Sequence, residues 1–208
     1  MGRTFTIGSY AGIPVKLHWS LGLLFLFLAY FGRVIINLDN QGLAWFLILI
    51  FTLFLCVIFH EFGHALVAKK FGIQTKDIIL SPIGGIARLE RIPEKPKDEV
   101  IIALAGPLMN LLIACLILIV LLLISHPISI PSDSYPQNIR EFLRVAFWLN
   151  IILFVFNLIP AFPMDGGRIL RALLRTKMDI MQATKIASRI GTGIAIVLMT
   201  IVLWYRYT

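Results

Sequence analysis

Charged residues are scarce in this sequence. They make up 14% of its 208 residues while hydrophobic residues make up 59%, against averages of about 25% and roughly 45–50% in soluble domains. The mean hydropathy is correspondingly high, at +0.89. This balance excludes a disordered chain, a coiled coil and almost any soluble globule, and it indicates a protein with several membrane spans.

Cysteine is scarce as well. Cys56 and Cys115 both lie in apolar runs, so the sequence predicts no disulfide framework. The 19 basic residues exceed the 11 acidic ones by +8, a surplus that could attract nucleic acid. The basic residues flank the apolar runs instead of forming one stripe, so we expect no nucleic-acid partner.

Several apolar segments are long enough for a spanning helix, which needs about 20 mostly apolar residues. They cover 17–36, 40–67, 100–125, 142–159 and 184–204. We therefore expect an all-α membrane protein, a polytopic bundle of about five transmembrane helices.

The distribution of lysine and arginine predicts the orientation. These residues cluster in 69–99 and 168–189 and are missing from 37–42 and 126–138. Because cytoplasmic loops carry the excess of lysine and arginine, the first two segments should be cytoplasmic. We expect a multi-pass protein of the cell membrane whose N-terminus is cytoplasmic.

Shorter elements are predicted at the cytoplasmic face. Two apolar runs within 5–17, around Gly8 and Gly12, are typical of a hairpin or edge strand, and 76–89 predicts a β-hairpin that turns at Gly84-Gly85. Segment 165–174 predicts a short amphipathic helix at the interface.

The sequence His60-Glu61-Phe62-Gly63-His64 lies inside an apolar helix. Residues four apart share a helix face, so both imidazoles can bind one zinc ion, and Glu61 is close enough to act as general base. Ionisable groups in a membrane helix cost a few kcal/mol each unless paired or solvated, which favours a functional site. A polar patch that only joins helices is the alternative.

Nine residues separate His60 from Lys69. At 1.5 Å per residue, the metal would lie about 14 Å from the basic end of the helix, on the active-site side that we expect to be cytoplasmic.

Zinc needs a third protein ligand, and Asp165 is the candidate. It follows Pro160 and Pro163, which break the preceding helix; irregular backbone at membrane depth is tolerated where it is buried in protein or lines a wet cavity. The alternative role for Asp165 is the N-cap of the next helix.

Asn157 lies eight residues earlier, at the end of the preceding span. Its amide could donate to an oxyanion or hold a substrate strand. A helix cap or an interhelical hydrogen bond is an equally good interpretation.

Taken together, HEFGH, Ala105-Gly106-Pro107 with Asn110, and the stretch from Asn157 to Arg168 (NLIPAFPMDGGR) resemble the site-2 protease family of intramembrane zinc metalloproteases, in its compact branch without a PDZ domain. The resemblance covers nearly the whole chain. It implies His60, His64 and Asp165 as zinc ligands, Glu61 as general base and Asn157 as a substrate-positioning residue.

The resemblance also implies the activity: cleavage of a peptide bond in or near a transmembrane segment of a membrane-protein substrate, in regulated intramembrane proteolysis. We expect residues 1–208 to form a single protease core without CBS or PDZ domains. A non-proteolytic zinc-binding adaptor or metal carrier is the alternative. A prenyl-protein endopeptidase fits less well, because no suitable glutamate ligand follows Glu141.

Overall fold

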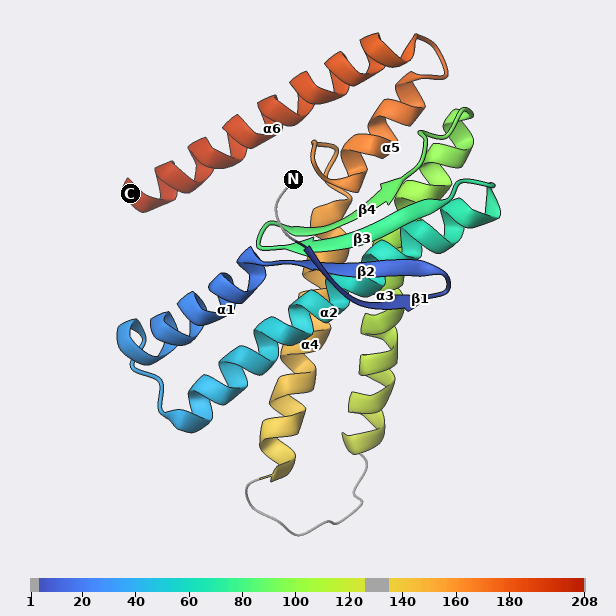
Figure 1. The fold of residues 1–208 in the computed structure, drawn as a ribbon. Helices are drawn as coiled ribbons and strands as arrows, with labels where there is room; N and C mark the ends of the chain where they lie inside the picture. The colour runs from blue at the N-terminus through green and yellow to red at the C-terminus, as the bar shows by residue number, and fades with distance from the viewer. Residues whose placement is uncertain (1–3, 126–134, 208) are drawn as a thin grey trace.

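The structure, a computed structural model, describes residues 4–125 and 135–207. Figure 1 shows long helices arranged around a small sheet. In chain order the elements are β1 (Thr4–Tyr10), β2 (Ile13–His18), α1 (Ser20–Tyr30), the π-helix η1 (Phe31–Ile35), α2 (Asn40–Lys70), β3 (Thr75–Ser81), β4 (Gly84–Leu89), α3 (Pro96–Ser125), α4 (Tyr135–Asn157), α5 (Asp165–Leu174) and α6 (Ile180–Tyr207).

The four strands form one sheet in the order β1-β2-β3-β4. Both predicted hairpins are present, since β1 pairs antiparallel with β2 and β3 with β4. The first turns at Ala11 and Gly12, whose φ angles of 53° and 82° lie in the left-handed region. A parallel pairing of β2 with β3 joins the hairpins, which the sequence pattern did not indicate.

The turn of the second hairpin differs from its prediction. Pro82 and Ile83 form it, whereas Gly84 and Gly85 already belong to β4. The reason lies beside the strand: a Cβ at Gly85 would come within 2.8 Å of both Glu61 and Val57. Glycine at this position lets β4 pass close to α2.

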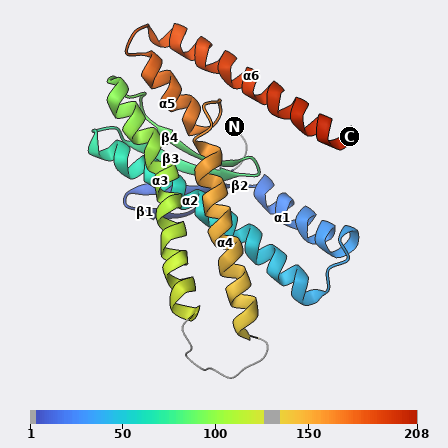
Figure 2. The ribbon, with the colours of Figure 1, turned by 180° about the vertical axis from the view of Figure 1, so that it is seen from behind.

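The helices α2, α3 and α4 pack together, and both views place α3 beside α4 (Figures 1 and 2). Small residues permit the close contact of α2 with α3, because a Cβ at Gly63 would lie 2.5 Å from the carbonyl oxygen of Ala105. The segment Ala105-Gly106-Pro107 thus lies where the two helices approach closely.

Within the described residues, three helices are long and apolar enough to cross a membrane: α2, α3 and α6. The first predicted span is the shorter apolar stretch Ser20–Ile35, and α4 carries Arg140, Glu141 and Arg144 in its first half. The protein is thus mostly helical with a small sheet, as expected, but the count of five spans is not confirmed.

The predicted short helix is present as α5, and α6 packs on it. Ala183, Ala187 and Gly191 are buried at intervals of four, and a Cβ at Gly191 would come within 2.9 Å of Ala161. The second half of α6 exposes apolar side chains such as Ile196 and Val202. In Figure 2 this half stands apart from α1 and α4.

Candidate metal centre

His60, His64 and Asp165 meet in the interior. The Nε2 atoms of both histidines lie 3.0 Å from Asp165 Oδ2 and 3.1 Å from each other. All three residues are buried, and they form a group able to hold a metal ion. The sequence places the aspartate more than a hundred residues from the histidines, so this meeting depends on the fold.

Local structure explains how each ligand reaches this point. His60 and His64 lie one turn apart on α2. Asp165 is the first residue of α5, whose N-cap is Met164, without a side-chain cap hydrogen bond. The N-cap interpretation of Asp165 is therefore wrong, and its carboxylate points to the histidines instead.

Two glycines let α5 begin so close to the broken end of α4. A Cβ at Gly166 would lie 2.2 Å from the carbonyl oxygen of Ile159, and one at Gly167 would lie 2.7 Å from the backbone nitrogen of Phe162. Neither position has room for a side chain. The pair Gly166-Gly167 is thus a packing requirement of the site.

The chemistry of the three atoms calls for a cation between them. His64 Nδ1 faces the carbonyl oxygen of Ile102 at 2.7 Å, and because a carbonyl only accepts, Nδ1 carries the hydrogen. In the neutral ring Nε2 then has a lone pair, which points at the Asp165 carboxylate. Acceptors this close repel one another unless a cation or a shared proton lies between them, and a metal ion satisfies all three atoms at once.

The distances also fit zinc. Tetrahedral ligands with bonds of about 2.0–2.1 Å lie about 3.3 Å from one another. The observed separations of 3.0–3.1 Å are slightly shorter. Three protein ligands leave the fourth position for water or substrate, as in catalytic zinc sites.

Helix α3 forms the wall behind the histidines. A Cβ at Gly106 would lie 2.2 Å from His64 Nε2 and 2.6 Å from His60 Nε2. Any side chain at this position would press on both nitrogen atoms and on the space that a metal needs.

Glu61 faces the same cavity from the next position on α2. The cavity, of about 450 Å³, is lined by all three candidate ligands, Glu61, Asn157 and residues of β4. Glu61 Oε2 accepts a hydrogen bond of 2.8 Å from the backbone N–H of Ala87 on β4. This bond fixes the carboxylate beside the sheet edge.

Asn157 lines the cavity from the last residue of α4. Its Nδ2 donates to the carbonyl oxygen of Leu153 at 2.9 Å. That bond matches the interpretation of Asn157 as a helix-end residue, but an amide nitrogen has a second hydrogen, which remains for a ligand. The structure is compatible with both interpretations.

Ser81, Asn110 and Arg168 also line the cavity, and sequence reasoning gave Asn110 and Arg168 no role there. Arg168 Nη1 lies 3.4 Å from Asp165 Oδ1. Asn110 on α3 is fully buried. Their spacing from neighbouring motif residues is the signal that could have identified them: Arg168 follows Asp165 by three positions, and Asn110 follows Gly106 by four.

A buried ionic network holds α5 in place. Glu99 of α3 is completely buried and accepts hydrogen bonds from Arg171 Nε at 2.8 Å and Nη2 at 2.5 Å. Arg175 binds the other carboxylate oxygen and also donates to the carbonyl oxygens of Pro93 and Glu94. The network joins the helix that carries Asp165 to the start of α3.

Two other residues with metal-binding side chains lie outside the centre. His18 ends β2, and its Nδ1 lies 2.5 Å from the Ser20 hydroxyl oxygen. Cys56 is buried one turn before His60, and its sulfur accepts from Asn150 Nδ2 at 3.2 Å.

Comparison with known proteins decides the family. The family model described as peptidase family M50 matches residues 48–126 and 122–198. The chain belongs to peptidase family M50. The solved site-2 protease from Methanocaldococcus jannaschii is similar, with a TM-score of 0.69 and 38% identity, over 98% of this chain and 87% of that chain. The predicted site-2 protease family is confirmed.

One curated relative of this M50 family member is named for an enzymatic activity. Zinc metalloprotease MJ0392 of Methanocaldococcus jannaschii is 43% identical over 201 residues, which cover 96% of this chain and 54% of that protein. This M50 family member spans about half the length of the curated relatives it matches.

Proposed function

We propose that this M50 family member is a zinc-dependent intramembrane endopeptidase, which hydrolyses a peptide bond in or near a transmembrane segment of a membrane protein. One observation carries the proposal. His60, His64 and Asp165 converge in one cavity with Glu61, and three of these four residues lie on a helix able to cross a membrane. The similarity to a curated zinc metalloprotease supports it.

In this proposal His60 Nε2, His64 Nε2 and Asp165 Oδ2 hold one zinc ion. When bound, zinc lowers the pKa of water to about 7 and polarises the scissile carbonyl. The hydrogen bond from His64 Nδ1 to Ile102 fixes that ring in the tautomer whose Nε2 is free to bind metal.

Glu61 is the general base and later the general acid. Its carboxylate takes a proton from the attacking water and returns it to the amine that leaves the scissile bond. The hydrogen bond from Ala87 holds the carboxylate at a fixed place. A positioned base of this kind contributes about 10²–10⁴-fold in rate.

Asn157 positions substrate. One Nδ2 hydrogen is used within α4, and we assign the second to the substrate carbonyl oxygen, on which negative charge develops. Arg168 lies at the same cavity with a quarter of its side chain exposed. Its guanidinium lies 3.4 Å from Asp165 Oδ1 and places a positive charge beside that carboxylate.

The substrate is extended where it is cut, because an intact helix hides its amides in intrahelical hydrogen bonds. Strand β4 lies last in the sheet order, and the Ala87 N–H on its outer side points at Glu61. An extended substrate segment that pairs with this edge would lie beside the general base. This pairing follows from the position of β4 and from the lining of the cavity.

The remaining expectations belong to the same proposal. Residues 1–208 act as one protease core in the cell membrane, with the N-terminus and the site toward the cytoplasm. The biological role is regulated intramembrane proteolysis. A metal carrier would need ligands along a path through several spans. In the described part of the chain, His60, His64 and Asp165 are the one cluster of His, Cys, Asp or Glu side chains able to hold a metal.

Coexpression with tagged single-span membrane proteins tests the proposal. Wild-type protein should cut a substrate, and Glu61→Gln should keep zinc in a one-to-one ratio while cleavage falls at least about 100-fold. Glu90→Gln, which changes an exposed carboxylate, is the matched control and should cleave normally. Retained cleavage by Glu61→Gln would overturn the assignment of the base, and purified protein without zinc would overturn the metal site.

A further inference from the structure

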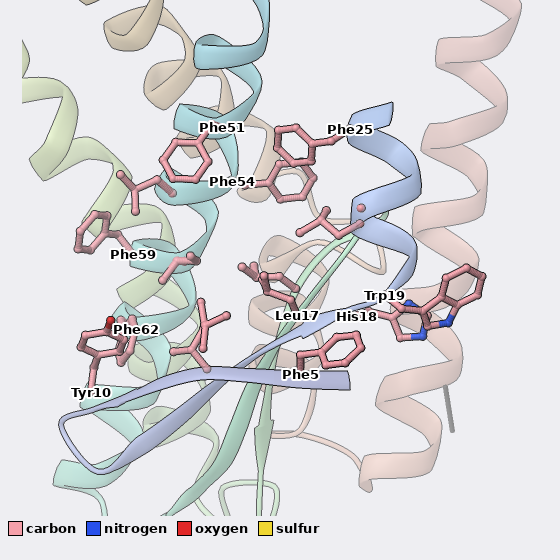
Figure 3. A pocket seen from close by; sticks show the side chains of 17 residues that line it. Phe5, Tyr10, Leu17, His18, Trp19, Phe25, Phe51, Phe54, Phe59 and Phe62 are labelled. Carbon is pink, nitrogen blue, oxygen red and sulfur yellow. The ribbon is translucent and has the colours of Figure 1, made fainter. Parts of the chain in front are cut away.

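A second cavity, of about 750 Å³, lies among β1, β2, α1 and α2. Figure 3 shows aromatic side chains of β1, α1 and α2 around it, together with Leu17 and His18 of β2. Its lining is almost wholly apolar and includes Phe5, Leu17, Phe25, Phe54, Phe59 and Phe62. Volume and lining are those of a site for an apolar ligand.

This cavity is separate from the metal centre. Phe59 and Phe62 of α2 line it, whereas His60 and Glu61 line the catalytic cavity. Successive residues of a helix point about 100° apart, so α2 itself separates the two cavities. A peptide bound here would not reach Glu61.

The rim of the cavity is continuous with the surface that faces lipid. Phe51, Leu55 and Phe59 both line the cavity and are 61%, 40% and 44% exposed on α2, a helix able to cross a membrane. Apolar cavities do not hold water, and the bilayer core supplies none. The occupant that can enter is therefore a component of the bilayer.

The polar groups of the lining are gathered near the junction of β2 and α1. His18 Nδ1 faces the hydroxyl of Ser20 at 2.5 Å and its backbone N–H at 3.4 Å, so Nδ1 accepts and the neutral ring carries its hydrogen on Nε2. Trp19, half exposed, lies next to His18. Both rings can donate to the ester or phosphate oxygens of a lipid.

We propose that this cavity binds one acyl chain of a bilayer phospholipid, with the oxygens of its head at His18 and Trp19. The chain lies along α2 and fills the space between α1 and α2, which share few direct contacts. The proposal rests on the membrane location of the protein and not on its proteolytic activity.

Two glycines provide a matched pair of variants. Gly22 on α1 lines the cavity, and a Cβ there would meet nothing within 4 Å; the same is true of Gly193 on α6, which lies elsewhere. A Cβ at either position meets no other atom, so Gly22→Leu adds a side chain at the cavity lining and Gly193→Leu makes the same change outside it. Gly22→Val adds a smaller side chain at the same position of the cavity lining.

Native mass spectrometry of delipidated protein, titrated with dioleoylphosphatidylcholine in detergent, measures the binding. Wild type and Gly193→Leu should retain one lipid, Gly22→Leu should bind at least about tenfold more weakly, and Gly22→Val should be intermediate. Equal retention by wild type and Gly22→Leu would overturn the proposal. Unchanged lipid binding with lost cleavage in Gly22→Leu would likewise overturn the proposal and would indicate that substrate docks in this cavity, away from Glu61.

Several polar atoms are buried beside the histidine rings, on the side that faces away from the candidate metal. His60 Nδ1 and both polar atoms of the Asn110 amide are buried without a hydrogen-bond partner among the described residues. Metal-binding histidines almost always donate their second nitrogen to a partner. His64 has one in Ile102, so the unmatched nitrogen of His60 is the exception.

Asn110 is placed to supply the missing partner. It follows Gly106 by one helical turn on α3, and Gly106 contacts the rings of both histidines; residues four apart share a face. Asn150 on α4 lies beside Cys56, one turn before His60. Its Oδ1 is also buried without a hydrogen-bond partner among the described residues. Donors and acceptors are thus gathered where one buried water could join them.

We infer that Asn110 is a positioning residue, whose Oδ1 receives the His60 Nδ1 hydrogen through one bound water. This link fixes the His60 tautomer and ring orientation for metal binding. Loss of such a partner typically weakens metal binding about 10–100-fold. The inference rests on the proposed zinc site, but its test measures affinity and not cleavage.

Competition with a zinc chelator measures the affinity of purified variants, and the cobalt-substituted absorption spectrum reports the ligand geometry. Asn110→Leu should release zinc at least about tenfold more readily and alter the cobalt spectrum, whereas Asn110→Asp and Asn110→Ser, which keep an acceptor oxygen, should stay near wild type. Wild-type affinity and spectrum in Asn110→Leu would overturn the inference. Equal losses in all three variants would show a merely structural role, and absence of zinc from wild type would instead refute the proposed site itself.

Discussion

The Cα of Gly106 stands against the imidazole of His64. A Cβ at Gly106 would lie 2.2 Å from Nε2 and 2.5 Å from Cε1 of that ring, closer than real Cβ atoms come to other atoms. The absence of a side chain at one position of α3 is thus a condition for two side chains of α2 to converge. The motif Ala105-Gly106-Pro107 serves the candidate metal centre through this contact.

Gly106→Ala should therefore weaken zinc binding. The methyl group must displace His64 or His60, whose Nε2 lies 2.6 Å from the Cβ position. Because zinc needs its ligands within a few tenths of an ångström of ideal distances, we expect zinc affinity to fall at least about tenfold. Zinc per protein after dialysis against a chelator is the measurement.

Two other glycines separate this effect from general helix packing. Gly193→Ala adds a methyl group in open space and should retain zinc fully. Gly63→Ala presses on the backbone of Ala105 at 2.5 Å and should lower the melting temperature more than Gly106→Ala does. Full zinc retention in Gly106→Ala would show that the ring contact does not constrain the site.

Glu99→Gln should destabilise both α5 and the metal centre. The buried Glu99 carboxylate neutralises Arg171 and Arg175, and removal of one member of a buried ion pair typically costs about 3–5 kcal/mol. Because α5 begins with Asp165, zinc retention should fall together with the melting temperature. Thermal unfolding in detergent and metal analysis check both effects.

A surface ion pair provides the control for this variant. Glu94 binds Arg91 at 3.4 Å and is largely exposed, so Glu94→Gln should change stability by less than about 1 kcal/mol. Similar melting temperatures for the two variants would mean that the Glu99 network does not hold α5 in place.

The sequence predicts the residues that meet in the candidate metal centre more readily than the architecture that joins them. His60 and His64 are found by their interval of four, because one helix fixes their relation. Asp165 is singled out because Pro160 and Pro163 mark an irregular segment before it. Each of these signals is local, and only the resemblance to a known family indicates that these residues belong to one site.

The sequence pattern does not predict contacts between segments that lie far apart in the chain. Nothing in residues 13–18 or 75–81 predicts that β2 pairs parallel with β3, since strand partners are set by tertiary packing. The partners of Glu99 are also hidden, because Arg171 and Arg175 look like topology signals until the fold brings them to α3. The count of five spans is not confirmed, because Arg140, Glu141 and Arg144 make the first half of α4 less apolar than a spanning helix.

The ion pairs of the buried Asp77 predict that the stability of the fold decreases at acidic pH. Hydrogen bonds from Arg88 at 2.6 and 2.5 Å and from Lys16 at 2.7 Å lower the pKa of this carboxyl from 3.8 to about 2, against the effect of burial. An aspartate with a lowered folded-state pKa stabilises the fold above its ordinary pKa, and this contribution is lost as pH falls from about 4 to about 2.

We therefore expect Asp77→Asn to lower the melting temperature at pH 7 and to flatten its fall between about pH 4 and pH 2. Melting curves across this range, compared with wild type, measure the difference, and Glu90→Gln, at an exposed position, should behave like wild type. Parallel curves for Asp77→Asn and wild type would show that the Arg88 and Lys16 bonds do not stabilise the sheet.

Gly85→Val should separate zinc binding from cleavage. A Cβ at Gly85 would lie 2.8 Å from Glu61 Cγ and from Val57, so valine must push the Glu61 side chain away from its bond to Ala87. The histidines lie on the α3 side of α2 and are not touched, so zinc content should stay at wild type while cleavage falls by about 10²-fold or more, as for a displaced general base. Gly84→Ala, which has open space but a φ of 132°, tests whether backbone strain in the hairpin alone has this effect. If Gly85→Val cleaves at the wild-type rate with normal zinc, β4 does not position Glu61, and the pairing of substrate with this edge loses its structural basis.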